Sequence, residues 1–176
     1  MGWYDYILET VFGIPEDHQH DCPSNDPFGT SPCGLLPPGT PVFCHFTLNI
    51  AEHTGICLGD KIVHLDGSGA VICSTPVEFL ARLNGTNLAD NIYYAANHEG
   101  HALASPEIAS RAIQQIGNHP GYHLLAGNCH DFSVSCIHGQ TMFQNWRLHD
   151  VECAITTAFH TRDWQWRCWG GWQNLQ

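Results

Sequence analysis

Cys129 lies in the stretch AGNCHDFS (126–133), between an asparagine and a histidine, and a run with helix-forming character follows it. A thiol in the first turn of a helix meets the positive end of the helix dipole, which favours the thiolate. The thiolate is the nucleophile of cysteine enzymes, and it needs a base nearby. Asn128 is a residue type that caps helix N-termini. Cys129 is therefore the candidate nucleophile, with a buried structural cysteine as the alternative.

Two of the 13 histidines are the candidate bases because of the elements that carry them. His53 lies in EHTGICLGD and His64 in KIVHLDG, with Gly59-Asp60 between the two runs as a turn. If this turn joins two strands, the imidazoles lie near one another across the pair. One ring can then accept the proton of the thiol while the other orients it, which is the logic of a catalytic triad. Ordinary sheet histidines are the alternative interpretation.

The elements expected around these residues are short strands followed by helices. Residues 15–41 are rich in Pro, Gly, Ser and Asp, which predicts a loop. Strands are expected at 42–50, 53–60, 61–67, 70–74 and 91–97, the first four as an antiparallel meander. Helices are expected at 77–83, 105–117 and 129–138, and the pattern after 140 is less clear. Strands followed by helices, without regular alternation, predict the α+β class.

The helix expected at 105–117 has a clear amphipathic pattern. Ser105 fits its N-cap and Pro106 its first position. The residues expected to line its buried face are Ile108, Ala112, Ile113 and Ile116.

These motifs together resemble the lecithin:retinol acyltransferase family, the circularly permuted branch of the papain-like NlpC superfamily. The family pattern has a histidine before a Gly-Ile-x-x-Gly strand, a second histidine in a later strand, a tyrosine and an Asn-Cys-x-x-Phe motif. This chain matches it with HTGICLGDKIVHLDG (53–67) and YHLLAGNCHDF (122–132). LLPPGTPV (35–42) and the 105–117 helix also fit the family. The resemblance covers about 37–139 and implies a permuted papain-like (NlpC-type) antiparallel sheet packed with helices.

The resemblance implies a role for each matching residue. Cys129 is the nucleophile, His53 the general base and His64 the third, orienting residue. Tyr122 and Asn128 support the substrate or the oxyanion, together with the backbone N–H of Cys129 at the helix start. The family works through a thioester, which water, an amine or an alcohol then resolves. This mechanism implies no cofactor and no metal.

The chain departs from the family pattern at three positions. It has Cys-His-Asp-Phe at 129–132 where the family has Cys-Glu-His-Phe, and Thr40 replaces an acidic residue before the first strand. It also lacks the C-terminal membrane helix of many vertebrate lipid enzymes. The substrate is therefore less defined than the fold and the nucleophile.

The charge balance excludes some classes of partner. The chain has 17 acidic and 6 basic residues, a formal net charge of −11. Nucleic acid is excluded because phosphate binding needs clustered Lys and Arg. No apolar run reaches the roughly 18 residues of a membrane span. The N-terminal stretch has no basic region before its apolar residues and is a poor signal peptide, so we expect a cytoplasmic protein or export without a cleavable signal.

Three further features have competing interpretations. Nine cysteines in no obvious framework indicate a reducing compartment, most of them acting as small buried groups. HQHDC (18–22) with Cys33, Cys44 and His45 matches no standard zinc spacing, so a solvated loop is preferred to a metal site. The Trp-rich tail 162–176 either closes the core, which is preferred, or contacts a membrane interface together with the aromatic N-terminus.

The sequence thus predicts one domain in three parts: an N-terminal extension (1–36), a catalytic core (37–139) and a Trp-rich extension (140–176) that packs on it. We expect a cysteine-dependent acyl hydrolase or acyltransferase acting through a thioester on Cys129, with a lipid acyl ester as substrate. One alternative is a cysteine amidase or peptidase of the permuted NlpC or deSUMOylating-isopeptidase type, which cuts peptidoglycan or (iso)peptide bonds and acts as a toxin or effector. A non-catalytic binding module is the other alternative. The oligomeric state is left open.

Overall fold

The computed structural model describes residues 34–45, 52–81, 91–121, 128–140 and 147–174. Their elements are β1 (Thr40–His45), β2 (Glu52–Cys57), β3 (Ile62–Leu65), β4 (Val71–Ser74), α2 (Pro76–Leu80), β5 (Ile92–Asn97), α3 (Pro106–Gln115), α4 (Cys129–His138), α5 (Leu148–Ala158), β6 (Trp164–Cys168) and the 3-10 helix η2 (Gly170–Asn174). The strands form a six-stranded sheet in the order β4-β3-β2-β1-β5-β6, and every pair is antiparallel. The α+β class predicted from the sequence is confirmed.

The meander β1–β4 follows from turn residues between β-branched strands. Between β2 and β3, Leu58 donates from its backbone N–H to the carbonyl of Lys61 at 2.8 Å. Gly59 in this turn has a φ of 99°, which glycine adopts without steric strain. Ile56 pairs with Val63 across the two strands. The hairpin expected at Gly59-Asp60 is therefore present, and its register fixes where His53 and His64 lie.

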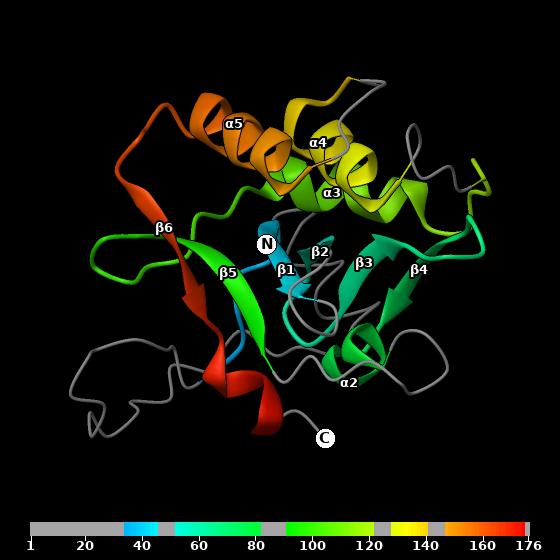
Figure 1. The fold of residues 1–176 in the computed structure, drawn as a ribbon, viewed down its shortest axis with the longest axis horizontal. Helices are drawn as coiled ribbons and strands as arrows, with labels where there is room; N and C mark the ends of the chain where they lie inside the picture. Colours follow the sequence, from blue (N-terminus) through cyan, green and yellow to red (C-terminus); the bar gives the residue numbers. More distant parts are fainter. Residues whose placement is uncertain (1–33, 46–51, 82–90, 122–127, 141–146, 175–176) are drawn as a thin grey trace, which may run out of the picture.

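Both faces of the sheet are covered. Figure 1 shows α3, α4 and α5 together over one face, whereas α2 and η2 lie on the other side. Because side chains alternate along a strand, Ile56 and Val63 pack in the helix-side core while their neighbours Cys57 and Ile62 pack in the second core. Phe79 of α2 and Trp169 complete this second core. The central strands are therefore buried on both sides.

The described residues after 140 form α5, β6 and η2, which the sequence interpretation did not identify. Helix α5 packs against α4, and β6 pairs with β5 at the edge of the sheet. Trp169 is fully buried, which agrees with the core interpretation of the tail, and Trp164 and Trp166 pack partly buried against the helix-side core. The tail thus extends the sheet and its second core.

One residue of the predicted buried helix face is exposed. Ile108 and Ala112 of α3 are buried as expected, but Ile116 is 39% exposed. The reason is that α3 ends at Gln115 and Ile116 is its C-cap, with an extended backbone that no longer follows the helical face.

The structure describes two further features that the sequence analysis considered, the cysteines and the possibility of a membrane-spanning helix. The described segments contain seven cysteines, and four of them are buried: Cys44, Cys57, Cys129 and Cys136. In these same segments, no helix has both the length and the apolar character that crossing a bilayer requires.

Gly55 of β2 tests the close approach of β2 and β3. A Cβ atom added at this position would lie 2.7 Å from Ile62 Cγ2 and 2.9 Å from the carbonyl oxygen of Val63. We therefore expect Gly55→Ala to lower the free energy of unfolding by about 1–3 kcal/mol through overpacking. Gly67→Ala is the control, because a Cβ there meets no atom within 4 Å. Equilibrium urea unfolding measures both variants, and equal stabilities would contradict the packing described.

Candidate active site

Helix α4 begins at Cys129, as the sequence predicts. The side chain of Asn128 caps it by accepting from the backbone N–H groups of His130 (2.9 Å) and Asp131 (3.1 Å). The helix ends at Gly139, which has the left-handed φ of 73° typical of a glycine C-cap. Cys129 is 2% exposed, so the sulfur lies at a capped helix start inside the protein.

The imidazoles of His53 and His64 are in contact. His53 Nε2 lies 3.3 Å from His64 Nδ1, and the rings meet edge to face with an interplanar angle of 76°. The register explains this contact: Ile56 pairs with Val63, so Gly55 lies opposite His64, and His53 is two residues away on the same face. Since Gly55 has no side chain, the two rings can meet across the pair.

The histidine pair continues to a third polar group. His64 Nε2 lies 2.9 Å from Ser74 Oγ on the neighbouring strand β4. The ring of Phe79 packs on both imidazoles, with centroid distances of 4.9 Å to His53 and 5.2 Å to His64. His53, His64 and Ser74 are 3%, 0% and 4% exposed, so this chain of polar groups is shielded from water.

Helix α4 brings the thiol to the strand that carries His53. Cys129 Sγ lies 3.9 Å from the carbonyl oxygen of Glu52, the residue that precedes His53. Thr54, the residue after His53, donates from its hydroxyl to the carbonyl oxygen of Cys129 at 2.9 Å. The sulfur is thus held beside the first residues of β2.

The pKa of the Cys129 thiol differs from the sequence expectation. Burial raises this pKa, and hydrogen bonds from Thr54 and from the amides of Cys129 and His130 lower it by less. The expectation that the helix dipole yields an easily ionised thiol is therefore wrong for the resting protein. The physical reason is desolvation: a thiolate with little water around it is less stable than the helix N-terminus can offset.

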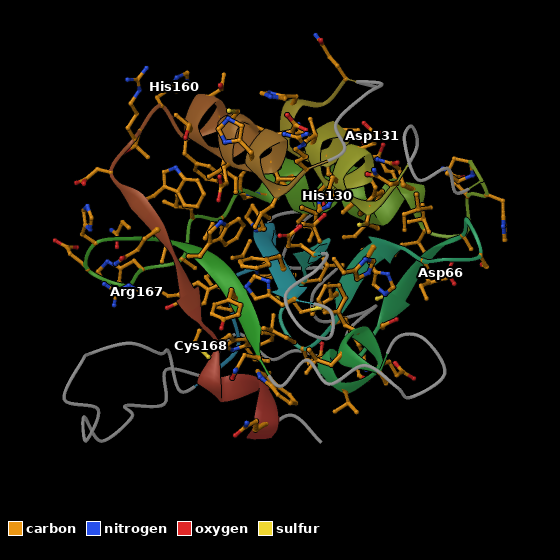
Figure 2. The ribbon with its side chains drawn as sticks, in the orientation of Figure 1. Asp66, His130, Asp131, His160, Arg167 and Cys168 are labelled. Atoms are coloured by element: carbon orange, nitrogen blue, oxygen red, sulfur yellow. The ribbon has the colours of Figure 1, made fainter. Side chains whose placement is uncertain are left out.

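His130, directly after the nucleophile candidate, is a buried neutral imidazole. Burial lowers its pKa from 6.5 to about 4, although Asp150 and Asp131 act in the opposite direction. Figure 2 shows His130 and Asp131 at the start of α4, with His130 on the side that faces the sheet. Its Nδ1 lies 3.3 Å from the Thr54 hydroxyl.

The structure brings His53 and His64 into contact, and it places Asn128 and Cys129 at the start of α4, where the sulfur lies beside the backbone of Glu52. Tyr122 is outside the described residues. Sequence interpretation missed Ser74 and Thr54; the alternation along β2 and β4 offered the only signal for them.

The described segments contain no group of three or more His, Cys, Asp or Glu side chains that could hold a metal ion. Residues 18–22 and Cys33 lie outside the description.

Comparison with known proteins identifies the family. The family model described as Lecithin retinol acyltransferase matches residues 38–142, more than half of the chain. The chain belongs to the lecithin retinol acyltransferase family. This membership supports an acyltransferase or hydrolase of the thiol-enzyme type. No curated protein and no solved structure matches the chain. The matched range includes β1 to α4. It therefore contains all four described site residues, His53, His64, Asn128 and Cys129.

The buried His130 predicts a pH dependence of folding. Its pKa is about 4 in the folded protein and 6.5 as the ordinary value, so the unfolded chain binds the proton first as the pH falls. The contribution of neutral His130 is complete above pH 6.5 and is lost between 6.5 and about 4. This loss amounts to roughly 3 kcal/mol of unfolding free energy.

His130→Asn tests this assignment, because an amide cannot titrate in that range. We expect the variant to show a smaller loss of unfolding free energy over this interval in urea titrations at several pH values. His119→Asn, at an exposed position, is the matched control. If His130→Asn retains the full pH dependence of the parent protein, the assignment is wrong.

Proposed function

We propose that the chain is a cysteine-dependent acyltransferase or hydrolase that forms a thioester on Cys129. The observation that carries the proposal is the buried contact of 3.3 Å between His53 and His64 at the strand where α4 places the thiol. Two imidazoles in contact inside a protein form a proton acceptor with a defined orientation. The family match, which includes all three residues, supports the same chemistry.

The contacts lead to one distribution of protons. His53 as base needs a lone pair toward the sulfur, and its Nε2 faces His64, so we assign the accepting atom to Nδ1. The proton of His53 is then on Nε2 and is donated to His64 Nδ1. The proton of His64 is consequently on Nε2 and is donated to Ser74 Oγ at 2.9 Å. Ser74 thereby fixes the orientation of His64, and His64 that of His53.

The raised pKa of the thiol agrees with proton transfer during the reaction. Because burial disfavours a lone thiolate, the resting pair is a neutral thiol and a neutral imidazole. When the sulfur attacks, its proton passes to His53, and the opposite charges arise side by side. Burial opposes this pair less than it opposes a single charge.

The proposed reaction has two steps, formation of the thioester and its resolution. In the first, Cys129 Sγ bonds to the acyl carbonyl carbon, and His53 returns the proton to the leaving alcohol as the ester bond breaks. In the second, His53 takes a proton from water or another acceptor as this attacks the thioester carbon; the C–S bond breaks, the acyl product leaves, and His53 returns the proton to Cys129 Sγ. The backbone N–H of Cys129 at the start of α4 is the proposed donor to the oxyanion.

A lipid acyl ester is the proposed substrate, because the family that matches the chain is named for a lecithin acyl donor. A peptide or isopeptide amide is the second candidate, since the same thiol–imidazole pair can attack an amide. The geometry of the described residues supports the roles of nucleophile and base, and the choice of a lipid ester rests on the family match.

Intact-mass spectrometry after incubation with phospholipid vesicles tests the proposal. We expect a mass increase of one acyl chain, located on Cys129 by peptide mapping and absent in Cys129→Ala. Cys153→Ala is the control, because Cys153 is the exposed cysteine among those described and is distant from α4's first turn in sequence. An adduct that maps to Cys153 instead would contradict the proposal.

The histidine variants test the roles in the pair. We expect His53→Ala to lower turnover by about 10²–10⁴-fold, as for loss of a general base. His64→Ala should lower it less, because His64 acts through His53. If purified muropeptides are cleaved while no lipid substrate forms an adduct, the amide alternative replaces the lipid ester. Unchanged turnover of His53→Ala would exclude His53 as the base.

A further inference from the structure

We infer that the Thr54 hydroxyl is a positioning group that holds the nucleophile-bearing start of α4 against β2, the strand that carries the proposed base; this inference rests on the proposed function. Thr54 is the residue directly after His53 on β2. Its side chain points to α4, whereas the ring of His53 packs against Phe79 of α2. Adjacent residues of β2 therefore place the ring of the proposed base on one face of the sheet and the hydrogen bond to the nucleophile-bearing helix on the other.

The hydrogen bonds of Thr54 use its full capacity. A hydroxyl donates one hydrogen bond and accepts two. Thr54 Oγ1 donates to the carbonyl oxygen of Cys129 at 2.9 Å and accepts from Ser133 Oγ at 3.0 Å. Since its single proton is used, the contact of 3.3 Å with His130 requires a proton on His130 Nδ1. This hydroxyl therefore connects β2 to three residues in the first turns of α4.

Because this connection is buried, loss of the Thr54 hydroxyl cannot be compensated by water. Thr54 and Ser133 are fully buried and His130 is 5% exposed, so removing the hydroxyl leaves two donors and one carbonyl without their partner in a dry environment. The start of α4 would then shift to find other partners. Since the sulfur belongs to the first residue of α4, such a shift moves it relative to His53.

A second effect acts on the sulfur itself. Hydrogen bonds from Thr54, the larger of them from its backbone N–H, lower the pKa of the Cys129 thiol against the effect of burial. Since the hydroxyl gives its proton to the carbonyl of Cys129, its loss acts on the thiol by displacing the start of α4, which moves the sulfur away from the donors that lower its pKa. A residue with a purely structural role in the core would leave the reactivity of the thiol unchanged once the protein is folded.

Thr54→Val, Thr54→Ser and Thr40→Val form the test set. Valine has the shape of threonine without the hydroxyl, and serine restores the hydroxyl. Thr40→Val is the matched control, because Thr40 is also fully buried and donates its hydroxyl to the carbonyl of Pro37, but on β1 beside Cys57 at the other end of β2. Thermal unfolding checks that each variant is folded. The readout is the rate of alkylation of Cys129 by iodoacetamide across pH, followed by peptide mapping.

We expect Thr54→Val to slow alkylation of Cys129 about 10- to 100-fold at neutral pH and to shift the rate profile to higher pH. In turnover, kcat should fall while KM changes little. Thr54→Ser should recover most of the parent rate, and Thr40→Val should match the parent although its melting temperature falls. If Thr54→Val does not fold, Thr54→Ser and Ser133→Ala are compared, and Ser133→Ala should show a smaller shift in the same direction.

Equal alkylation profiles for Thr54→Val and Thr40→Val would overturn the inference. So would a Thr54→Ser variant as slow as Thr54→Val. These outcomes are separate from the proposed function, because alkylation needs no acyl substrate: a chain that forms no acyl adduct on any lipid or peptide can still show the Thr54 effect on the thiol.

Discussion

The contact between two buried imidazoles, His53 and His64, is the constraint on which the site depends. Neither ring has the freedom of a surface histidine, because Phe79 packs on both and less than one-twentieth of either residue is exposed. A buried ring must keep its polar atoms paired, and here each partner determines the protonation of the next. Ser74 therefore acts on His64, and through it on the proposed base.

The two faces of β2 carry different groups of the site. Odd-numbered residues of this strand present His53 and the unsubstituted Gly55 toward α2, and even-numbered residues present Thr54 and Ile56 toward α4 and the helix-side core. The thiol meets the strand at its first residues, next to Glu52. A shift of the β2–β3 register by one residue would turn one of the two histidines to the helix side and separate the rings, so the hairpin turn and the site are determined together.

Much of this arrangement could be predicted from the sequence, because the signals are local. The turn glycines, the capping asparagine and the alternating strands predict the hairpin and the start of α4 without any long-range information. Ser74 and Thr54 could not be assigned in the same way, since their roles depend on which strand lies beside β3 and how closely α4 approaches. The direction of the Cys129 pKa shift also depends on burial, which the helix position alone does not reveal.

Helix α5 shows a different reason for a missed element. Its buried residues, Val151, Ala154 and Ile155, have helical spacing, but its N-cap is Arg147 in place of a Ser, Thr, Asp or Asn. The start signal was therefore weak. Strand β6 follows at the edge of the sheet, where half-buried aromatic residues read equally well as surface or core.

The protonation of the histidine pair tests the central claim most directly. In ¹⁵N-labelled protein at neutral pH, long-range ¹H–¹⁵N correlation spectra distinguish the two tautomers of each ring, with His53→Gln and His64→Gln spectra providing the assignments. The account predicts a neutral His53 and a neutral His64, both protonated on Nε2, with Nδ1 of His53 available as the acceptor for the thiol. A proton on Nδ1 of His53 in the resting protein would contradict it.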